Sequence, residues 1–113
     1  MNWTEARGIQ EGRPVKMQDR MAEAADEAAA MLKALSNPSR LLLLCQLVER
    51  EKSVGELEAA LDLSQAYVSQ QLARLRAEGL VAATRDGRIV RYRLADSRIA
   101  PVIQTIYEQY CPH

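Results

Sequence analysis

The chain has 113 residues and a formal net charge of zero, with 48% hydrophobic and 27% charged residues. These values are typical of one soluble globular domain. They argue against a disordered or fibrous chain and leave no room for a separate catalytic module. No apolar run reaches the roughly 18–20 residues that a membrane span needs, and no apolar signal region follows a charged N-terminus. We therefore expect a cytoplasmic protein.

The zero net charge hides an uneven distribution of charged residues. Residues 64–93 contain six arginines and two acidic residues, which gives +4, whereas residues 19–63 contain five basic and nine acidic residues, which gives −4. The basic half can face a phosphate backbone while the acidic half faces away from it.

The chain begins with a segment that lacks a clear pattern. Residues 1–18 contain Gly8, Gly12 and Pro14 without an apolar period, so we expect a flexible or loosely docked arm before a single domain at residues 19–113. From residue 19 to residue 35, apolar residues recur at steps of three and four, which predicts a helix. Its apolar stripe consists of Met21, Ala24, Ala25, Ala28, Met31, Leu32 and Leu35.

Two further helices are predicted by their N-terminal signals. Asn37 and Pro38 have the positions of an N-cap and of a proline in the first turn, and the helix they begin should run to about Glu51. This helix is apolar around much of its circumference and should lie in the core, through Leu41, Leu42, Leu44, Cys45, Leu47 and Val48. Ser53 and Glu56 have the spacing of a capping box, which predicts a short helix that ends near Asp62.

A fourth helix should begin after Ser64 and end at Gly79. Its core-facing residues would be Val68, Leu72 and Leu75, with Ala66 as a further candidate. Two short helices joined by a tight turn, of which the second begins with polar side chains, are typical of a helix-turn-helix.

A hairpin and a last helix complete the predicted fold. Residues 80–85 and 89–94 predict two strands, and the Asp86-Gly87-Arg88 segment between them is a tight-turn signal. The last helix, from about Ser97 to Tyr110, tolerates Pro101 in its first turn. Its apolar stripe consists of Ile99, Val102, Ile103, Ile106, Tyr107 and Tyr110. The predicted fold is a winged helix-turn-helix, mostly α, with about five helices and a two-stranded wing.

The second helix of a helix-turn-helix lies in the major groove of DNA, where base edges can be distinguished. Gln65, Ser69 and Gln70 are candidates for base reading, because glutamine can pair with both N6 and N7 of adenine. Ser64 and Arg74 are candidates for phosphate contacts. The full set of candidate DNA contacts is Ser64, Gln65, Tyr67, Ser69, Gln70, Gln71, Arg74 and Arg88.

The alternative for this polar surface is a solvated helix face without a partner. The order of capped helix, polar-fronted helix, glycine stop and arginine-bearing hairpin favours DNA binding. Arg88 at the tip of the hairpin could enter a minor groove or contact phosphate, whereas Arg91 and Arg93 could equally keep the hairpin soluble.

The pattern resembles that of the ArsR-type winged-helix repressors over residues 19–111. The resemblance is carried by LKALSNPSRL at residues 32–41, by SQ and VS at 64–65 and 68–69, by residues 72–76, and by GLV at 79–81. It implies a homodimer that pairs through the first and last helices and reads an inverted repeat in double-stranded DNA. The two apolar stripes on those helices independently offer surface for such a dimer.

Many ArsR-type proteins bind a transition metal through cysteines before the reading helix or through acidic and histidine residues of the last helix. Neither set is present, and His113 is the only histidine. A zinc site could be drawn from Cys45, Cys111 and His113, but zinc normally takes four ligands. We therefore expect no metal and no other cofactor.

The two cysteines, Cys45 and Cys111, are too few for a secreted disulfide scaffold. Their placement resembles the dithiol of the persulfide-sensing BigR and SqrR group of ArsR-type repressors. That resemblance implies that reactive sulfur species link the two thiols through a sulfur bridge and weaken DNA binding. The alternative is that Cys45 merely packs in the core. If the thiols do act as a sensor, we expect the more exposed one, Cys111 near the chain end, to react first.

The sequence is also compatible with other functions. The signal could be a general oxidant or a metal, the repressor could be independent of any ligand, or the domain could be a protein-interaction winged helix that does not bind DNA. An enzyme is disfavoured, because the chain has no glycine-rich phosphate loop and no credible pair of nucleophile and base.

Overall fold

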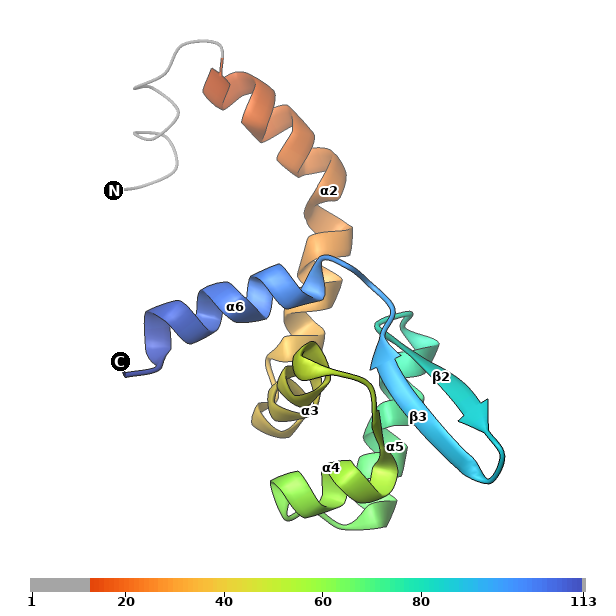
Figure 1. Cartoon of the computed structure of the whole chain (residues 1–113). Coiled ribbons are helices and arrows are strands. Elements are labelled where there is room, and N and C mark those ends of the chain that lie inside the picture. The colour runs from red at the N-terminus through yellow and green to blue at the C-terminus, as the bar shows by residue number, and fades with distance from the viewer. Residues whose placement is uncertain (1–12, 113) are drawn as a thin grey trace. The chain divides into compact units, whose positions relative to one another are not determined.

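The computed structural model describes residues 13–112. Its elements, in chain order, are α2 (Arg13–Leu35), α3 (Pro38–Glu49), β1 (Lys52–Ser53), α4 (Val54–Leu61), α5 (Gln65–Ala77), β2 (Val81–Asp86), β3 (Ile89–Leu94) and α6 (Ile99–Tyr110) (Figure 1). The described part therefore has the expected winged helix-turn-helix class, with five helices and a wing. The chain divides after Lys33 into two compact units, which are described separately. No helix in residues 13–112 is long and apolar enough to cross a membrane.

The first unit contains α2 as far as Lys33. The helix begins at Arg13, earlier than the expected Asp19, because Pro14 occupies the first turn, where its missing N–H costs no helical hydrogen bond. The remainder of the expected arm, residues 1–12, lies outside the described residues. The apolar stripe is confirmed as a helix face, and Met17, Met21 and Leu32 on this helix are all exposed.

The second unit is built around a leucine-rich core. Its completely buried side chains come from four helices and are Leu43, Leu44, Leu57, Val68, Leu72, Leu75 and Ile99. Asn37 caps α3 as expected, because its Oδ1 accepts hydrogen bonds from the N–H groups of Ser39 and Arg40.

The helix α3 contributes Leu44 and Leu47 to the core as expected, but the expected burial of Leu42 and Cys45 is wrong. Leu42 is 52% exposed and Cys45 is also exposed. Successive helical residues are about 100° apart, so a run of leucines cannot turn every side chain toward one core. Leu43, Leu44 and Leu47 take the buried side.

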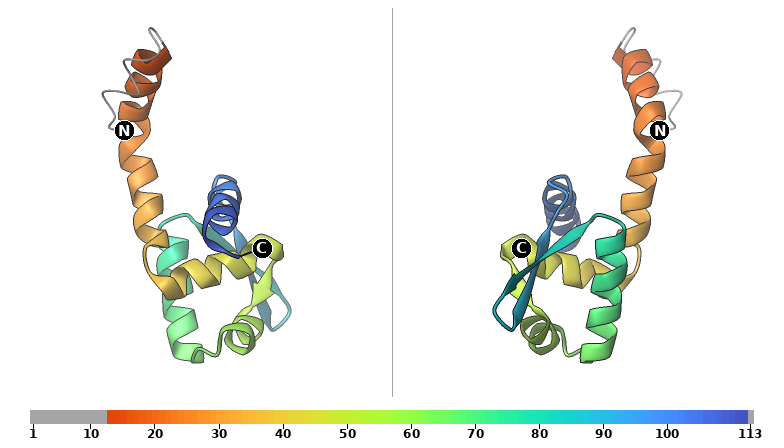
Figure 2. Two further views of the ribbon diagram at one scale, coloured as in Figure 1. Left: turned by 90° about the vertical axis from the view of Figure 1, so that its left-hand side faces the viewer. Right: turned by 90° about the vertical axis from the view of Figure 1, so that its right-hand side faces the viewer.

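The wing forms a three-stranded antiparallel sheet with β1, in the order β1-β3-β2. Asp86 pairs with Ile89 at the end of the ladder, which leaves Gly87 and Arg88 as the two turn residues. Gly87 has a φ of 63°, a conformation that glycine adopts without steric cost. Two further views show that β2 starts at the C-terminal end of α5, which it contacts, and that the hairpin then runs away from this helix (Figure 2).

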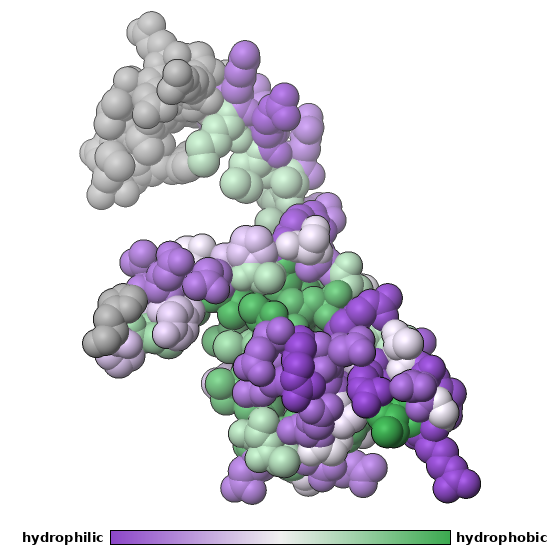
Figure 3. Space-filling view, in the orientation of Figure 1, coloured by the Kyte–Doolittle hydropathy of each residue, from purple (hydrophilic) through white to green (hydrophobic). Residues whose placement is uncertain are grey.

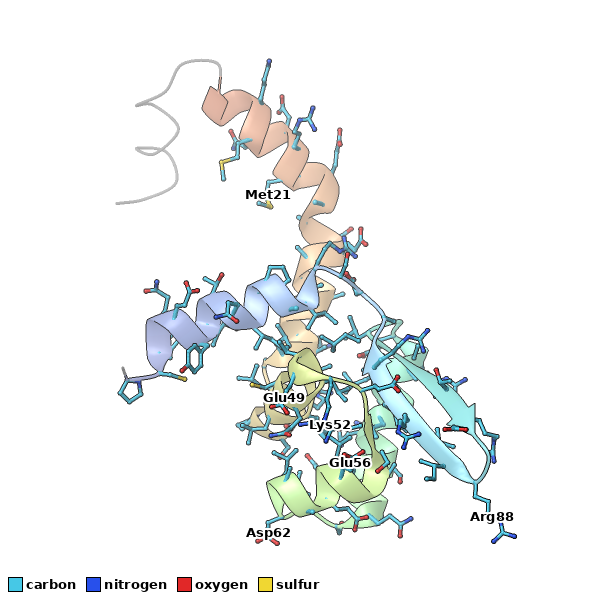
Figure 4. The ribbon with its side chains drawn as sticks, in the orientation of Figure 1. Met21, Glu49, Lys52, Glu56, Asp62 and Arg88 are labelled. Carbon is cyan, nitrogen blue, oxygen red and sulfur yellow. The ribbon has the colours of Figure 1, made fainter. Side chains whose placement is uncertain are left out.

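Strand β1 brings a lysine into the core, which the sequence does not predict. Lys52 is 5% exposed, and its Nζ donates a hydrogen bond of 2.6 Å to Oε1 of Gln46 on α3. Its Nζ also lies 3.7 Å from Oε1 of Glu49 (Figure 4). Because a buried ammonium must be hydrogen-bonded, this contact fixes β1, and through it β3, against α3.

A capping box begins α4, as predicted. The Ser53 hydroxyl accepts from the N–H of Glu56 at 3.2 Å, and the Glu56 carboxylate accepts from the N–H of Ser53 at 3.1 Å. Arg50 donates to the same carboxylate at 2.6 Å. The hydrogen bond from Arg50, followed by that from the Ser53 amide, lowers the pKa of Glu56 to about 2.

This pKa predicts a pH-dependent contribution to stability. The carboxylate of Glu56 is favoured in the folded state, so its contribution is complete above its ordinary pKa of 4.5 and is lost as the pH falls toward 2. We expect Glu56→Gln to lower Tm at pH 7, and the difference from the wild type to shrink between pH 5 and pH 3. The same exchange at the exposed Glu108 of α6 is the control. A difference that is equal at both pH values would contradict the assignment.

Candidate functional site

The turn between α4 and α5 sets the start of the candidate reading helix. Asp62 ends α4 with a φ of 53°, in the left-handed region that aspartate tolerates better than most residues. Ser64 then caps α5, because its Oγ accepts the N–H of Tyr67 at 3.2 Å. Only residues 62–64 separate the two helices, which is the connection expected of a helix-turn-helix.

The end of α5 is equally well defined. Gly79 has a φ of 79°, its N–H donates to the carbonyl of Arg76 at 3.0 Å, and the N–H of Leu80 donates to the carbonyl of Leu75 at 2.9 Å. These two bonds form a Schellman motif, in which a residue in the left-handed region satisfies the last carbonyls of a helix. The stop predicted at Gly79 is confirmed.

One side of α5 is buried and the other is open. Val68, Leu72 and Leu75 are completely buried, as expected. The opposite side is exposed at positions spaced by one turn, and the predicted contacts on it are Ser64, Gln65, Ser69, Gln70 and Arg74. Tyr67 is half-buried at the flank of this surface. The structure therefore gathers most of the predicted α5 contacts on one polar surface, which we call the reading face.

Gln71 does not belong to this surface. It is 8% exposed, because it lies three residues after Val68 and four before Leu75 and so shares their side of the helix. Its prediction as a DNA contact does not fit the structure, and the helical period could have shown this.

Ala66 is exposed, so its assignment to the core is wrong. It lies two residues before Val68, about 200° around the helix, and therefore on the open side. Ala73 is also exposed. The two methyl groups between polar side chains could contact thymine methyl groups in a major groove, a role that was missed because alanine carries no polar signal.

The wing carries four arginines. Two of them, Arg91 and Arg93, have side-chain partners, whereas Arg85 and Arg88 have none within the described part. Nη1 of Arg91 lies 3.4 Å from Oδ2 of Asp86, and Nη1 of Arg93 donates to Oγ1 of Thr84 at 2.8 Å. Arg88 is exposed, and no hydrogen bond or ion pair joins it to another residue of the described part. Figure 4 shows its side chain pointing away from the hairpin tip. Because Arg88 lies at the tip and points outward, it is the better placed of these two arginines for an external anion.

The predicted thiol pair lies on two helices that contact each other. Cys45 is on α3 and Cys111 is the C-cap of α6, where its N–H donates to the carbonyl of Tyr107 at 2.9 Å. Both thiols are unbridged and exposed. The alternative in which Cys45 packs in the core is therefore wrong, because the helix turns that position away from Leu44 and Leu47.

The structure offers no metal-binding cluster among residues 13–112, where no three His, Cys, Asp or Glu side chains are suitably grouped. The zinc site drawn from the two cysteines also requires His113, which lies outside the described residues.

Residues 37–83 match the sequence model of the family described as bacterial regulatory protein, arsR family. A biofilm growth-associated repressor of Agrobacterium fabrum is 45% identical over 91 residues, which make up 80% of this chain and 78% of that protein. The transcriptional activator HlyU of Vibrio cholerae is 39% identical over 100 residues, 88% of this chain and 92% of that protein.

The fold also matches solved structures. The crystal structure of the transcriptional repressor BigR from Xylella fastidiosa has a TM-score of 0.81 and 41% sequence identity, and the match covers 85% of this chain and 98% of that one. Reduced HlyU from Vibrio cholerae matches with a TM-score of 0.76 and 39% identity, over 82% and 98% of the two chains.

Proposed function

Because the chain belongs to the arsR family of bacterial regulatory proteins, and is a DNA-binding regulator rather than an enzyme, we propose that it is a homodimeric repressor that reactive sulfur species release from DNA. The observation that carries the DNA-binding part is the reading face of α5, which is polar, exposed and backed by buried Val68, Leu72 and Leu75. A helix held in this way can enter a major groove without losing its packing.

The residues of the reading face have distinct roles in this proposal. Gln65, Ser69 and Gln70 read base edges, and the two glutamines suit adenine. The Ser64 hydroxyl, whose oxygen already accepts the Tyr67 amide, still has a proton to donate to phosphate. Arg74 contacts the phosphate backbone, and Arg88 at the tip of the wing contacts phosphate or enters a minor groove.

Dimerisation would use the first and last helices. Exposed apolar or aromatic side chains lie on both, with Met17, Met21 and Leu32 on α2 and Tyr107 and Tyr110 on α6. Two protomers related by a two-fold axis would present two copies of α5 to half-sites about one DNA turn apart. This arrangement is supported by the family membership and the uncovered helix faces.

The proposed signal acts on Cys45 and Cys111. Thiolates attack persulfides and polysulfides, and a second thiol resolves the first adduct into a bridge. The exposure of both thiols supports such a reaction. A bridge would tie α3 to α6 and shift the dimer toward a state in which the two reading faces no longer match their half-sites, which requires differential affinity and no unfolding.

The reading face can be tested by separating base contacts from phosphate contacts. Gln70→Ala should cost about 1–3 kcal/mol of operator affinity and reduce the preference for operator over random DNA. Arg88→Ala should weaken binding to both and lower the salt slope by about one. Fluorescence anisotropy with operator and random DNA across salt concentrations measures the affinities and the salt slope. The control is Gln104→Ala on the exposed side of α6. Unchanged specificity in Gln70→Ala would argue against its role.

The thiol pair can be tested by substituting both cysteines. Polysulfide should release the wild type from DNA, whereas the protein with both Cys45→Ser and Cys111→Ser should stay bound. Mass spectrometry separates the signals, since a sulfur bridge adds sulfur beyond a plain disulfide. Release of the double variant would refute the dithiol mechanism. Equal release by peroxide, with formation of a plain disulfide, would favour a general oxidant sensor.

A further inference from the structure

The surface around each thiol combines apolar and aromatic groups with a carboxylate. On α3, Leu42 lies three residues before Cys45 and is 52% exposed, and Glu49 lies four residues after it with a side chain that is 73% exposed. Residues at these spacings are neighbours on a helix surface. Cys45 therefore opens onto a leucine side chain and a carboxylate.

Cys111 has a similar neighbourhood on α6. Tyr107 and Tyr110 are 50% and 83% exposed, and Glu108 is exposed three residues before the thiol. The helix geometry extends to Cys111 through its N–H, which bonds to Tyr107. Apolar residues also gather between α6 and α3 in the space-filling view (Figure 3).

The cations nearest along the chain all contact other residues. Glu108 is the only charged residue of α6, and α3 carries Arg40 and Glu49. Arg40 is half-buried and has a partner. Beyond the end of α3, Arg50 is held by Glu56 at 2.6 Å. The buried Lys52 donates to Gln46, and its Nζ lies 3.7 Å from Oε1 of Glu49, whose charge it offsets in part. Within residues 34–112, the exposed charges on the two helices that carry the thiols are thus mainly carboxylates.

This distribution determines which sulfur donor can approach. Resting on the proposed sulfur-sensing function, we propose that the thiol pair takes sulfur from uncharged or cationic organic polysulfanes in preference to anionic polysulfides and persulfides. Carboxylates lower the local concentration of an anion, and the exposed Leu42 contacts the organic groups of an uncharged donor. The reacting thiolates add further negative charge to the same surface.

The transfer balances without another oxidant when the donor is an organic trisulfide, R–S–S–S–R. One cysteine thiolate attacks the central sulfur, a new S–S bond forms, and the first RS⁻ leaves. The second cysteine thiolate attacks the same sulfur and displaces the second RS⁻. The product is Cys–S–S–S–Cys with two equivalents of RS⁻, so the trisulfide accepts the two electrons that the protein thiols lose.

Three trisulfides of matched size test the preference, namely the bis(2-hydroxyethyl), bis(2-aminoethyl) and bis(2-carboxyethyl) compounds. The reduced full-length protein is treated with each, and the rate of bridge formation is followed by intact mass. Each rate is divided by the rate at which dithiothreitol reacts with the same trisulfide, which removes differences in leaving-group reactivity among the donors. We expect the carboxylate donor to be about tenfold slower than the other two at low salt, with the gap closing as salt is raised.

The double variant Glu49→Gln, Glu108→Gln should raise the rate with the carboxylate donor and leave the hydroxyl donor unchanged. The same exchange at Glu23 and Glu27, which are exposed on α2, is the control. Equal rates for all three donors, or no effect of the double variant, would overturn the preference while leaving the sensing function intact. If no donor formed a bridge, the proposed function itself would be overturned.

Discussion

The packing of one side of α5 is the constraint on which the candidate interface depends. Val68, Leu72 and Leu75 are completely buried, which fixes the rotation of the helix about its own axis. Ser64 and Gly79 fix where it begins and ends, through an N-cap hydrogen bond and a Schellman motif. Because the core sets the rotation of α5 and the caps set its length, Gln65, Ser69 and Gln70 must lie on its exposed side. Replacing any of the three buried residues by a polar one would therefore change the orientation of the reading face, although none of the three belongs to it.

The parts of the fold that the sequence predicted are those with local signals. Caps at Asn37, Ser53 and Ser64, the stop at Gly79 and a tight turn at Gly87 all follow from side-chain chemistry within a few residues. The errors arose where a face had to be assigned. The burial of Gln71 and the exposure of Ala66 follow from the helical period that Val68, Leu72 and Leu75 set. The exposure of Leu42 and Cys45 depends on the rotation of α3, which hydrophobicity alone does not give in so leucine-rich a helix. Strand β1 has two residues, too few for an alternating pattern, and its buried Lys52 depends on Gln46 of α3.

The thiol pair and the reading face are connected through one core. The helix α3 carries Cys45 on its exposed side, while Leu43 and Leu44 on its other side pack in the same core as the buried residues of α5. It also contacts β3 of the wing, partly through Lys52 and the β1–β3 pairing. In the proposed mechanism, a bridge to α6 therefore acts on a helix that is already coupled to both DNA-contacting elements. Because closely packed protein cores move between discrete packings, a small displacement of α3 can be transmitted to α5 and the wing.

Selection of DNA duplexes from a random pool by the reduced full-length protein tests the central claim most directly. If the reading faces of a dimer bind two major-groove segments, the enriched sequences should form an inverted repeat whose half-site centres lie about one helical turn, roughly 34 Å, apart. Adenines should be over-represented at the positions that Gln65 and Gln70 reach. Failure to enrich any sequence, or enrichment of a site without two-fold symmetry, would contradict the account.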